Sequence, residues 1–284
     1  ECGKPTFLSE QEFRDLNLWV ACPECRGKME PGLVEGTYGY LCKSCEVGVE
    51  LASVLPTHLM GDRLSRGRKV APIGGAECKT SQTFEVGGCR IRLRDWTLED
   101  LPAYKHWLQP DQDWHRHDSP WAGPPRAETI EAMIEQKRQE ILDTDWPVPR
   151  KKVVIADMTT DRFIGTTNWY WQGRATSWRN VGISIYDPRD RGKGLGFEAL
   201  GLWTEHLFDV LPEIVRLGVG TWSGNVRMIG LAKKLGYLEE ACYRRARIVE
   251  GEYYDSVGYG VLREEWKHRY PNGFAADAPG IGKM

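Results

Sequence analysis

Three glycines at alternate positions, Gly192, Gly194 and Gly196, separate two stretches with different hydrophobic patterns. Residues 181–186 before them alternate between apolar and polar as a β-strand does, and residues 197–208 after them repeat apolar side chains at helical spacing. Glycine lets the backbone approach a ligand closely, and the positive end of the following helix dipole favours an anion. The order strand, glycine loop, helix therefore predicts a site for a pyrophosphate.

The spacing of this loop distinguishes it from other phosphate-binding loops. It lacks the Gly-Lys-Ser/Thr ending of a Walker A loop, and G-x-G-x-G differs from the G-x-G-x-x-G of dinucleotide-binding folds. Arg191-x-x-Gly194-x-Gly196 instead resembles the Arg/Gln-x-x-Gly-x-Gly/Ala signature of the GNAT acetyltransferase superfamily. In that family the loop holds the pyrophosphate of acetyl-CoA, so the resemblance implies acetyl-CoA, or another acyl-CoA, as a ligand here.

The resemblance extends over roughly residues 88–266, within the branch related to ribosomal-protein-alanine acetyltransferases. Besides the loop, the segments that carry it are Arg92–Leu101, Arg162–Thr167, Asn225–Tyr237 and Tyr259–Trp266. It implies an α/β fold with a mixed, mostly antiparallel sheet flanked by helices.

Local patterns predict the same class of fold. Strands are expected at 84–93, 153–157, 163–171, 181–186, 214–222, 241–249 and 253–262. Helices are expected at 97–107, 127–143, 197–208 and 225–235, the first opened by a capping box from Thr97 to Asp100. Alternation of strands with helices, ending in two strands, indicates a sheet of mixed sense.

Near the N-terminus, four cysteines form two C-x-x-C pairs, Cys22 with Cys25 and Cys42 with Cys45. Each pair lets two thiolates reach one ion, and two pairs complete a closed tetrahedral zinc site of the structural kind. A strand over 36–41 would belong to the resulting zinc ribbon. Disulfides are disfavoured in a reducing compartment, and a redox pair would need only one C-x-x-C.

Composition shifts suggest where the domains end. We expect a zinc-ribbon-like domain over 1–70, a linker over 71–87, an acyltransferase-like domain over 88–266 and a flexible tail over 267–284. The net charge of -2 gives no general electrostatic reason to bind nucleic acid. No apolar run has the length of a membrane helix and no secretory signal is evident, so a cytoplasmic location is expected.

The resemblance also implies which residues bind the cofactor. They are Ile183, Ile185, Arg191, Gly192, Lys193, Gly194, Leu195, Gly196 and Asn225. Backbone N–H groups of the loop would hold pyrophosphate, with added charge from Arg191 and Lys193. A free N–H near Ile183 to Ile185 would meet the thioester oxygen. Asn225 would contact the cofactor arm, or would only cap its helix.

The resemblance does not assign a general acid or a general base in this chain. Many relatives carry a tyrosine or a serine in the helix after the asparagine, but Ala232 and Met228 occupy those positions. An acid common in the preceding strand is replaced by Asn180. Activity does not require either group, because water can deprotonate an amine and a thiolate is a tolerable leaving group.

A loop over 109–121 supplies other candidates. It contains Asp113, His117 and Asp118 among tryptophans, whose apolar surroundings would shift a pKa toward neutrality. We take these three residues, with Asn225, as candidate catalytic residues, and a solvated loop without a catalytic role is the alternative. An acidic loop at the site would favour a cationic amine.

These features predict an acetyl-CoA-dependent N-acetyltransferase that acts on a primary amine of a small cationic molecule. A protein N-terminus is the second choice of acceptor. A different class of function is a CoA-binding adaptor without catalysis, whose ribbon binds a partner. The sequence does not set the oligomeric state.

Overall fold

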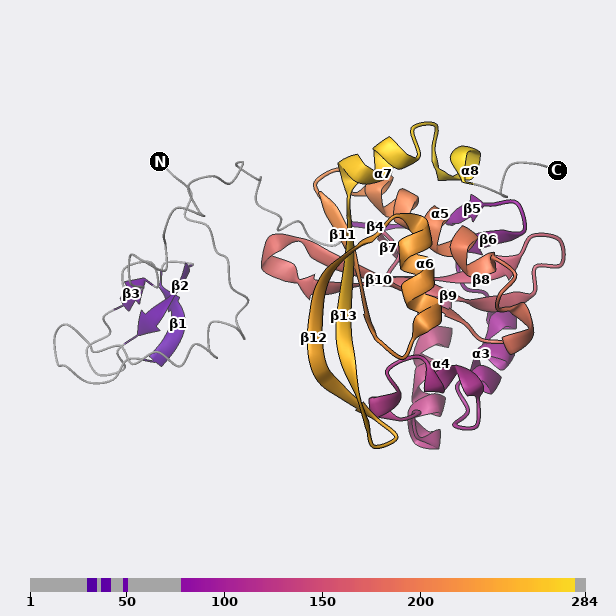
Figure 1. The fold of residues 1–284 in the computed structure, drawn as a ribbon, viewed down its shortest axis with the longest axis horizontal. Helices are drawn as coiled ribbons and strands as arrows, with labels where there is room; N and C mark the ends of the chain where they lie inside the picture. The colour runs from indigo at the N-terminus through magenta and orange to yellow at the C-terminus, as the bar shows by residue number, and fades with distance from the viewer. Residues whose placement is uncertain (1–29, 35–36, 42–47, 51–77, 279–284) are drawn as a thin grey trace. The chain divides into compact units, whose positions relative to one another are not determined.

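The computed structural model describes residues 30–34, 37–41, 48–50 and 78–278 (Figure 1). The chain divides into two compact units, residues 1–74 with 173–177 and residues 75–172 with 178–284. In the first unit, β1 (Glu30–Val34), β2 (Thr37–Leu41) and β3 (Gly48–Glu50) form an antiparallel sheet with β2 in the middle. The predicted strand over 36–41 is thus confirmed as β2. The predicted zinc ligands Cys22, Cys25, Cys42 and Cys45 lie outside the described residues.

The second unit contains an eight-stranded sheet in the order β12-β13-β11-β10-β9-β8-β6-β5. Its strands are β5 (Glu85–Gly87), β6 (Ile91–Arg94), β8 (Lys152–Asp157), β9 (Phe163–Gly173), β10 (Trp178–Ile185), β11 (Arg216–Trp222), β12 (Leu238–Val249) and β13 (Glu252–Leu262). The pairs β5–β6, β6–β8, β8–β9, β11–β13 and β12–β13 are antiparallel, whereas β10–β11 is parallel. The mixed, mostly antiparallel sheet is therefore confirmed. A separate pair joins β4 (Cys78–Thr80) to β7 (Trp146–Val148).

Helices cover both faces of this sheet. They are α3 (Leu101–Trp107), α4 (Ala127–Asp143), α5 (Leu195–Val210), α6 (Val226–Leu235), α7 (Arg263–Arg269) and α8 (Phe274–Asp277). Side chains of a strand alternate between faces, and β8 shows the division. Val153 and Ile155 pack in the cluster built around α5 and α6, whereas Val154 and Ala156 pack in the cluster of α3 and α4.

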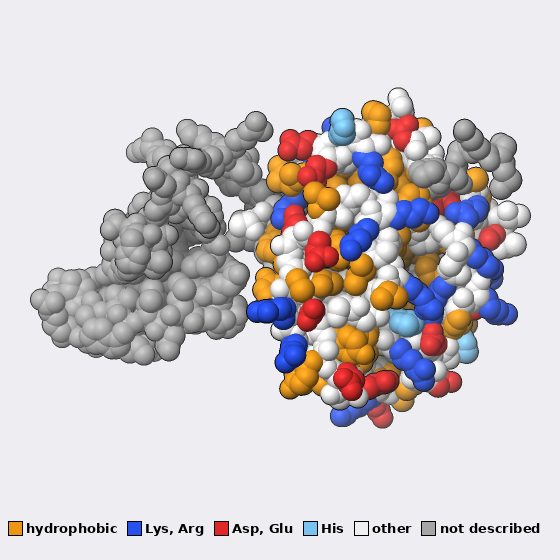
Figure 2. Space-filling view, viewed as in Figure 1, with side chains coloured by type: hydrophobic (Ala, Val, Ile, Leu, Met, Phe, Trp, Pro, Cys, Tyr) orange, Lys and Arg blue, Asp and Glu red, His pale blue; other side chains and the backbone are white. Residues whose placement is uncertain are grey.

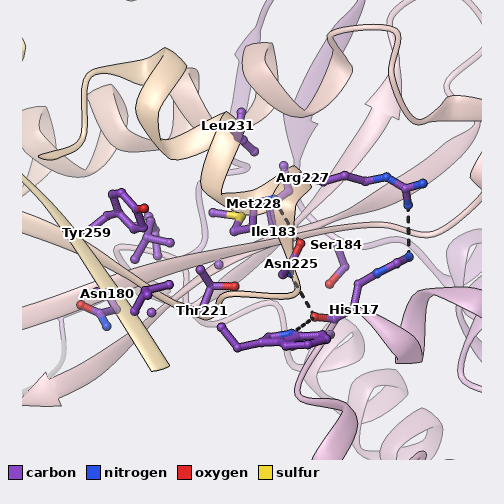
Figure 3. Close-up of a pocket in the computed structure, with 18 of the residues that line it drawn as sticks. His117, Asn180, Ile183, Ser184, Thr221, Asn225, Arg227, Met228, Leu231 and Tyr259 are labelled. Atoms are coloured by element: carbon purple, nitrogen blue, oxygen red, sulfur yellow. Dashed lines mark hydrogen bonds between the residues drawn. The ribbon is translucent and has the colours of Figure 1, made fainter. Parts of the chain in front are cut away.

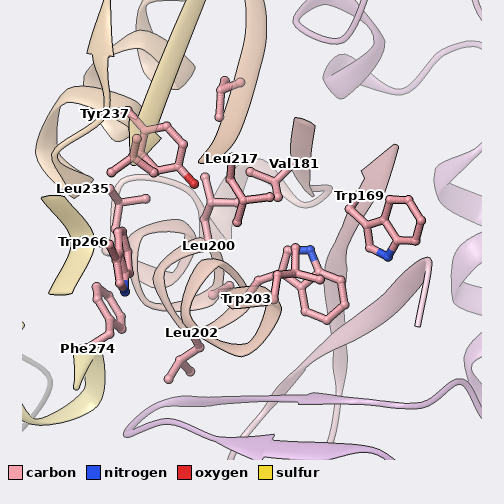
Figure 4. Packing of buried hydrophobic residues seen from close by; sticks show 14 of the residues in the cluster. Trp169, Val181, Leu200, Leu202, Trp203, Leu217, Leu235, Tyr237, Trp266 and Phe274 are labelled. Carbon is pink, nitrogen blue, oxygen red and sulfur yellow. The ribbon is translucent and has the colours of Figure 1, made fainter. Parts of the chain in front are cut away.

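Helix α5 lies at the centre of the larger cluster (Figure 4). Ala199, Leu200 and Leu202 are at most 3% exposed and point in different directions around the axis, so this helix is buried on more than one face. On the surface, acidic and basic side chains are interspersed over the face of the second unit that Figure 2 shows. Within the described residues, no helix is long and apolar enough to cross a membrane.

One predicted strand is a hairpin. The alternation over 84–93 predicts a single strand, but β5 and β6 are antiparallel partners joined by a turn at Gly88. The backbone N–H groups of Cys89 and Arg90 in this turn donate to the buried carboxylate of Glu198 on α5. Alternation alone does not show a turn that is fixed by a partner more than one hundred residues away.

The ends of the second unit also differ from the prediction. Strands β4 and β5 belong to it, although the sequence predicts a linker over 71–87. The tail predicted over 267–284 is instead folded through the end of α8. Phe274 is fully buried, with its ring centroid 5.7 Å from that of Trp266 and 5.1 Å from that of Tyr270. Together with the contact of Phe274 to Phe197 of α5, at 5.4 Å between ring centroids, these contacts fix α8 against α5 and α7.

Candidate active site

A cleft opens where the two parallel strands of the sheet separate. Strands β10 and β11 pair at only two positions, Arg179 with Leu217 and Asn180 with Gly218. Beyond these pairs lies a cleft of about 1680 Å³ (Figure 3). Residues of β9 to β13, the glycine loop, α6 and the loop over 109–121 line it. The sheet therefore supplies a binding site by leaving part of two neighbouring strands unpaired.

The cleft passes from one face of the sheet to the other. A Cβ placed on Gly196 of α5 would lie 3.9 Å from Ile183 and from Ile185, so these two side chains face α5. Met228 and Leu231 of α6 line the same side (Figure 3). Since side chains alternate along a strand, the even-numbered residues of β10 face the opposite side. One side is thus apolar and close to the glycine loop.

Backbone groups of β10 are directed into the cleft. The N–H of Tyr186 donates to Ile164 of β9 (3.2 Å), and the carbonyl of Gly182 accepts from the Thr167 hydroxyl of β9 (2.9 Å). N–H groups alternate in direction along a strand, so those of Ile183 and Ile185 point away from β9. Strand β11 has separated there, and the cleft takes its place. The N–H groups of Ile183 and Ile185 are therefore directed toward the cleft, where the sequence predicts a donor for a thioester oxygen.

The glycine loop has the backbone that its sequence predicts. Gly192 (φ 74°) and Gly194 (φ 83°) adopt the left-handed conformation that favours glycine, and Gly194 is the N-cap of α5. Gly192, Gly194 and Gly196 line the cleft, and Leu195 packs against the core. The side chain of Lys193 does not line the cleft. A negative ligand here would meet backbone N–H groups and the positive end of the α5 dipole.

Arg191 has a role that the sequence does not predict. Its guanidinium donates to the carbonyls of Ile185 (3.0 Å) and Tyr186 (2.7 Å), and it also binds the carboxylate of Asp113. This hydrogen bond to Arg191 lowers the pKa of Asp113, whose side chain does not line the cleft. Arg191, which lines the cleft, and Asp113 thus hold the loops together, a role beyond the cofactor binding and catalysis expected of them.

Asn225 caps α6 and also holds the loop over 109–121. Its Oδ1 accepts from the N–H of Met228 (3.1 Å), and its Nδ2 donates to the carbonyl of His117 (3.0 Å). Trp222 Nε1 donates to the same carbonyl (3.1 Å). Both polar atoms of the Asn225 amide are thus used within the protein. The capping interpretation holds, and the loop contact adds a function that no local pattern shows.

The imidazole of His117 lines the cleft as a neutral group. Its Nε2 lies 3.1 Å from Arg227 Nη1, and because a guanidinium only donates, Nε2 accepts. Burial and the charge of Arg227 lower the pKa of His117 below its usual value of 6.5. The accepting nitrogen is occupied by Arg227, so His117 is a weaker candidate for the base than an unpaired group would be.

Asp118 remains as a carboxylate at the cleft. It is accessible from the cleft, yet the surrounding protein desolvates it and raises its pKa, an effect opposed by the charge of Lys152. Lys152 itself donates to the hydroxyl of Tyr104 (3.0 Å) within the aromatic cluster of α3. A carboxylate with a raised pKa accepts a proton more readily than an ordinary aspartate.

Aromatic contacts hold the far end of the loop over 109–121. The indole of Trp121 lies edge-on to that of Trp222 at 6.5 Å, and Arg247 of β12 stacks over Trp121 at 4.5 Å. Sequence reasoning missed Arg227, Trp222 and Arg247, because each reaches the loop across more than one hundred residues. Within the described part of the chain, no group of three or more metal-ligating side chains is present.

The sequence matches the family model of the Acetyltransferase (GNAT) domain over residues 90–238, which is more than half of the chain. The chain belongs to the GNAT acetyltransferase family. This confirms the family indicated by the glycine loop and its flanking segments.

The sequence identity between the chain and individual GNAT proteins is low. It is 27% identical over 114 residues to the SPbeta prophage-derived uncharacterized N-acetyltransferase YokL of Bacillus subtilis, a match over 40% of this chain and 56% of YokL. The chain thus spans just over half the length of this curated relative. A GNAT-family acetyltransferase from Bacillus anthracis is similar in structure (TM-score 0.51, 15% identity, 64% of this chain and 99% of that one).

A second solved structure is the spermidine N-acetyltransferase of Vibrio cholerae in complex with CoA and spermine. It is similar with a TM-score of 0.50 and 18% identity, over 62% of this chain and 98% of that one. At such identities these structures confirm the fold and leave the acceptor to be argued from the residues of this chain.

Proposed function

We propose that this GNAT domain transfers an acetyl group, or another acyl group, from acyl-CoA to a primary amine. The main support is the cleft that opens where the pairing of β10 with β11 ends at Asn180, because the glycine loop at the start of α5 lines this cleft. The residues present fit the cofactor: left-handed glycines for the pyrophosphate, apolar side chains beside them, and unpaired N–H groups of β10 further along.

In this proposal the pyrophosphate binds the N–H groups of Gly192 to Gly196. The thioester carbonyl accepts from the N–H of Ile183, which stabilises the charge that develops on its oxygen. The acceptor enters from the opposite face and first loses one proton of its ammonium group to solvent. The neutral amine then attacks the carbonyl carbon and gives a second proton to Asp118. The carbon–sulfur bond then breaks and CoA leaves as a thiolate, which solvent protonates.

Cofactor binding and turnover test this function separately. Isothermal titration with acetyl-CoA is expected to show one site, and free-thiol release with a library of amines is expected to show turnover. Binding without turnover on any amine would favour the CoA-binding adaptor. This second candidate is supported by Ala232 and Met228, which stand where many relatives carry a residue that can donate a proton. Absence of binding would contradict both.

We also propose that Asp118 is the base. Asp118→Asn keeps the shape of the side chain and removes its ability to accept the proton. We expect kcat to fall by about tenfold to a thousandfold at neutral pH, with unchanged affinity for acetyl-CoA. If His117→Gln lowered kcat by this amount and Asp118→Asn had little effect on kcat, the base would be His117.

For the first unit we propose a structural zinc ion bound by Cys22, Cys25, Cys42 and Cys45. The spacing of the two C-x-x-C pairs supports this proposal. Elemental analysis is expected to show about one zinc ion per chain, and Cys22→Ser should remove it. Zinc-free protein with an unchanged circular dichroism spectrum would contradict it. The GNAT fold of the second unit is expected to survive chelation.

A further inference from the structure

We propose that the acceptor carries its amine on an uncharged polyhydroxylated ring, as an amino sugar or an aminocyclitol does. The ring would bind in the cleft on the face of the sheet opposite α5. This inference rests on the proposed transferase function and names its acceptor.

A recess without side chains lies on that face. Gly220 of β11 pairs with Gly258 of β13, and directly paired residues share a face. A Cβ placed on Gly220 would meet only Asn180 Nδ2 and the Tyr170 hydroxyl, each at 3.6 Å, and one on Gly258 would meet only Ala241 at 3.5 Å. Both glycines line the cleft. The floor is therefore backbone, with neutral polar groups at its edge.

Those polar groups have unused hydrogen-bonding capacity. Asn180 is 6% exposed, and its Nδ2 donates to Gln172 (3.2 Å), but its Oδ1 has no partner among the described residues. The side chain of Asn168 and the hydroxyl of Tyr170, which also line the cleft, likewise form no hydrogen bond within the part of the chain described. These groups face the cleft, so hydroxyl groups of a ligand can take the place of the water that would otherwise bind them.

Aromatic rings at the recess add an apolar surface of ring size. Trp178 is 39% exposed and Tyr170 is 40% exposed, and both line the cleft. Arg216 stacks on Trp178 at 5.1 Å and holds the indole in place. A sugar ring has an apolar face of C–H groups and an edge of hydroxyls, so it complements a site made of exposed aromatics and neutral amides.

The charges of the cleft favour one amine and not several. Three carboxylates of the described residues line it, and two are paired, Asp190 with Arg162 at 2.8 Å and Glu240 with Arg216. Only Asp118 is left to meet an ammonium group. A polyamine would bring further positive charges close to Arg216 and Arg247, without carboxylates to balance them.

A comparison of acceptors tests the inference. Free-thiol release would be measured with glucosamine, spermidine, cyclohexylamine and a tetrapeptide with a free N-terminus. We expect kcat/KM for glucosamine to exceed each of the others by at least about tenfold. Higher kcat/KM with spermidine, with the peptide or with cyclohexylamine would overturn the polyhydroxylated acceptor and leave the transferase function intact. No turnover on any of the four would overturn both.

Variants of the recess connect the preference to named residues. Tyr170→Phe removes one hydroxyl, and we expect it to lower kcat/KM for glucosamine about fivefold more than for cyclohexylamine, with KM for acetyl-CoA unchanged. Asn180→Leu should shift the same ratio by about tenfold or more. The matched control is Tyr253→Phe, an exposed tyrosine outside the cleft, which should leave the ratio unchanged. Equal losses on both amines in the recess variants would contradict the inference.

Discussion

Glu198 links two segments that lie 108 residues apart. Its side chain is fully buried in the first turn of α5, where it accepts from the N–H of Arg90 (2.8 Å) and from the Arg90 guanidinium (3.1 Å). A negative charge is favoured at the start of a helix. The Arg90 guanidinium also donates to the carbonyl of Lys193 (2.6 Å). The carboxylate of Glu198 therefore holds the β5–β6 turn directly and the glycine loop through Arg90.

His206 makes the stability of the domain sensitive to acid. It lies between Phe84 and Trp203, with ring centroids at 4.8 and 5.4 Å, and burial, with a smaller effect of Arg150, lowers its pKa from 6.5 to about 4. The imidazole of His206 binds a proton more tightly in the unfolded chain than in the folded one. The stability that the neutral imidazole contributes is therefore complete above pH 6.5 and is lost as the pH falls toward 4. The change amounts to about 2–3 kcal/mol.

His206→Phe keeps an aromatic ring and removes the titration. We expect the melting temperature of this variant to fall less than that of the natural protein between pH 7.5 and pH 4.5. Replacement of an exposed histidine, His268→Asn, should leave the slope unchanged. Parallel curves for His206→Phe and the natural protein would contradict the assignment.

Gly196 allows a test of the cofactor loop without backbone strain. A methyl group there would lie 3.7–3.9 Å from Leu231, Ile183 and Ile185, at ordinary contact distance. Gly196→Ala should therefore keep the fold and gain up to about 1 kcal/mol of stability, because alanine favours helix. The family signature admits alanine at this position, so the Kd of Gly196→Ala for acetyl-CoA should stay within about twofold. Gly196→Asp brings a carboxylate to the proposed pyrophosphate, and we expect it to raise this Kd at least about tenfold by calorimetry.

Gly194 is a poorer choice for this purpose. Its φ of 83° disfavours a side chain, and a Cβ would lie 3.0 Å from Arg90. A loss of affinity in Gly194→Asp would combine strain with a direct effect on the ligand. Unchanged affinity in a folded Gly196→Asp protein would place the cofactor elsewhere.

At the scale of elements, the loop over 109–121 is held from three directions. Arg191 binds it at Asp113, Asn225 binds it at His117, and Arg247 stacks on Trp121. Its position at the cleft thus depends on the glycine loop, the start of α6 and β12 together. These contacts fix the loop that carries Asp118 at the cleft.

Asn225→Asp separates the two functions of this residue. The carboxylate still accepts from Met228 and suits the positive end of α6, so stability should change by less than about 1 kcal/mol. The donor to the His117 carbonyl is lost. We expect KM for the amine to rise about fivefold, with KM for acetyl-CoA unchanged, in steady-state assays. A selective rise in KM for acetyl-CoA would instead support the cofactor-arm contact.

Helix α8 contributes to the core and not to a flexible tail. Phe274 is fully buried against Trp266 and Tyr270, and its ring occupies the space that a Cβ on Gly201 would need. Phe274→Ala should therefore cost about 3–5 kcal/mol in chemical denaturation. Tyr253→Ala, at an exposed aromatic, provides the comparison. A cost below about 0.5 kcal/mol for Phe274→Ala would contradict this packing.

Most elements could be predicted because their signals are local. Alternation and helical spacing predict β8, β9 and α4, and the capping box at Thr97 predicts the 3-10 turn Leu98–Asp100 that leads into α3. The glycine spacing indicates the proposed cofactor loop. The β5–β6 turn and α8 depend on Glu198 and Gly201, which are distant in sequence. The site divides in the same way, because Asn168 and Tyr170 reach the cleft only through the pairing of β9 with β10.

At the scale of the molecule, the described sheet of the second unit consists of two parts. Strands β12, β13 and β11 form one, and β10 to β5 form the other. They are joined by two residue pairs of the sheet, and the side chains of α5 and α6 pack across both. The hydrophobic core, more than the hydrogen bonds of the sheet, therefore keeps the two parts together.

The unpaired stretch of β10 also has a consequence for isotope exchange. Amide protons in the middle of a sheet normally exchange slowly with deuterium, because both neighbouring strands protect them. Ile183 and Ile185 lack that protection on one side, so their amides should exchange faster than those of Val154 and Ile155 in β8. Acetyl-CoA in the cleft should slow them again, as measured by mass spectrometry or NMR. Equal rates with and without the cofactor would mean that it does not reach this strand.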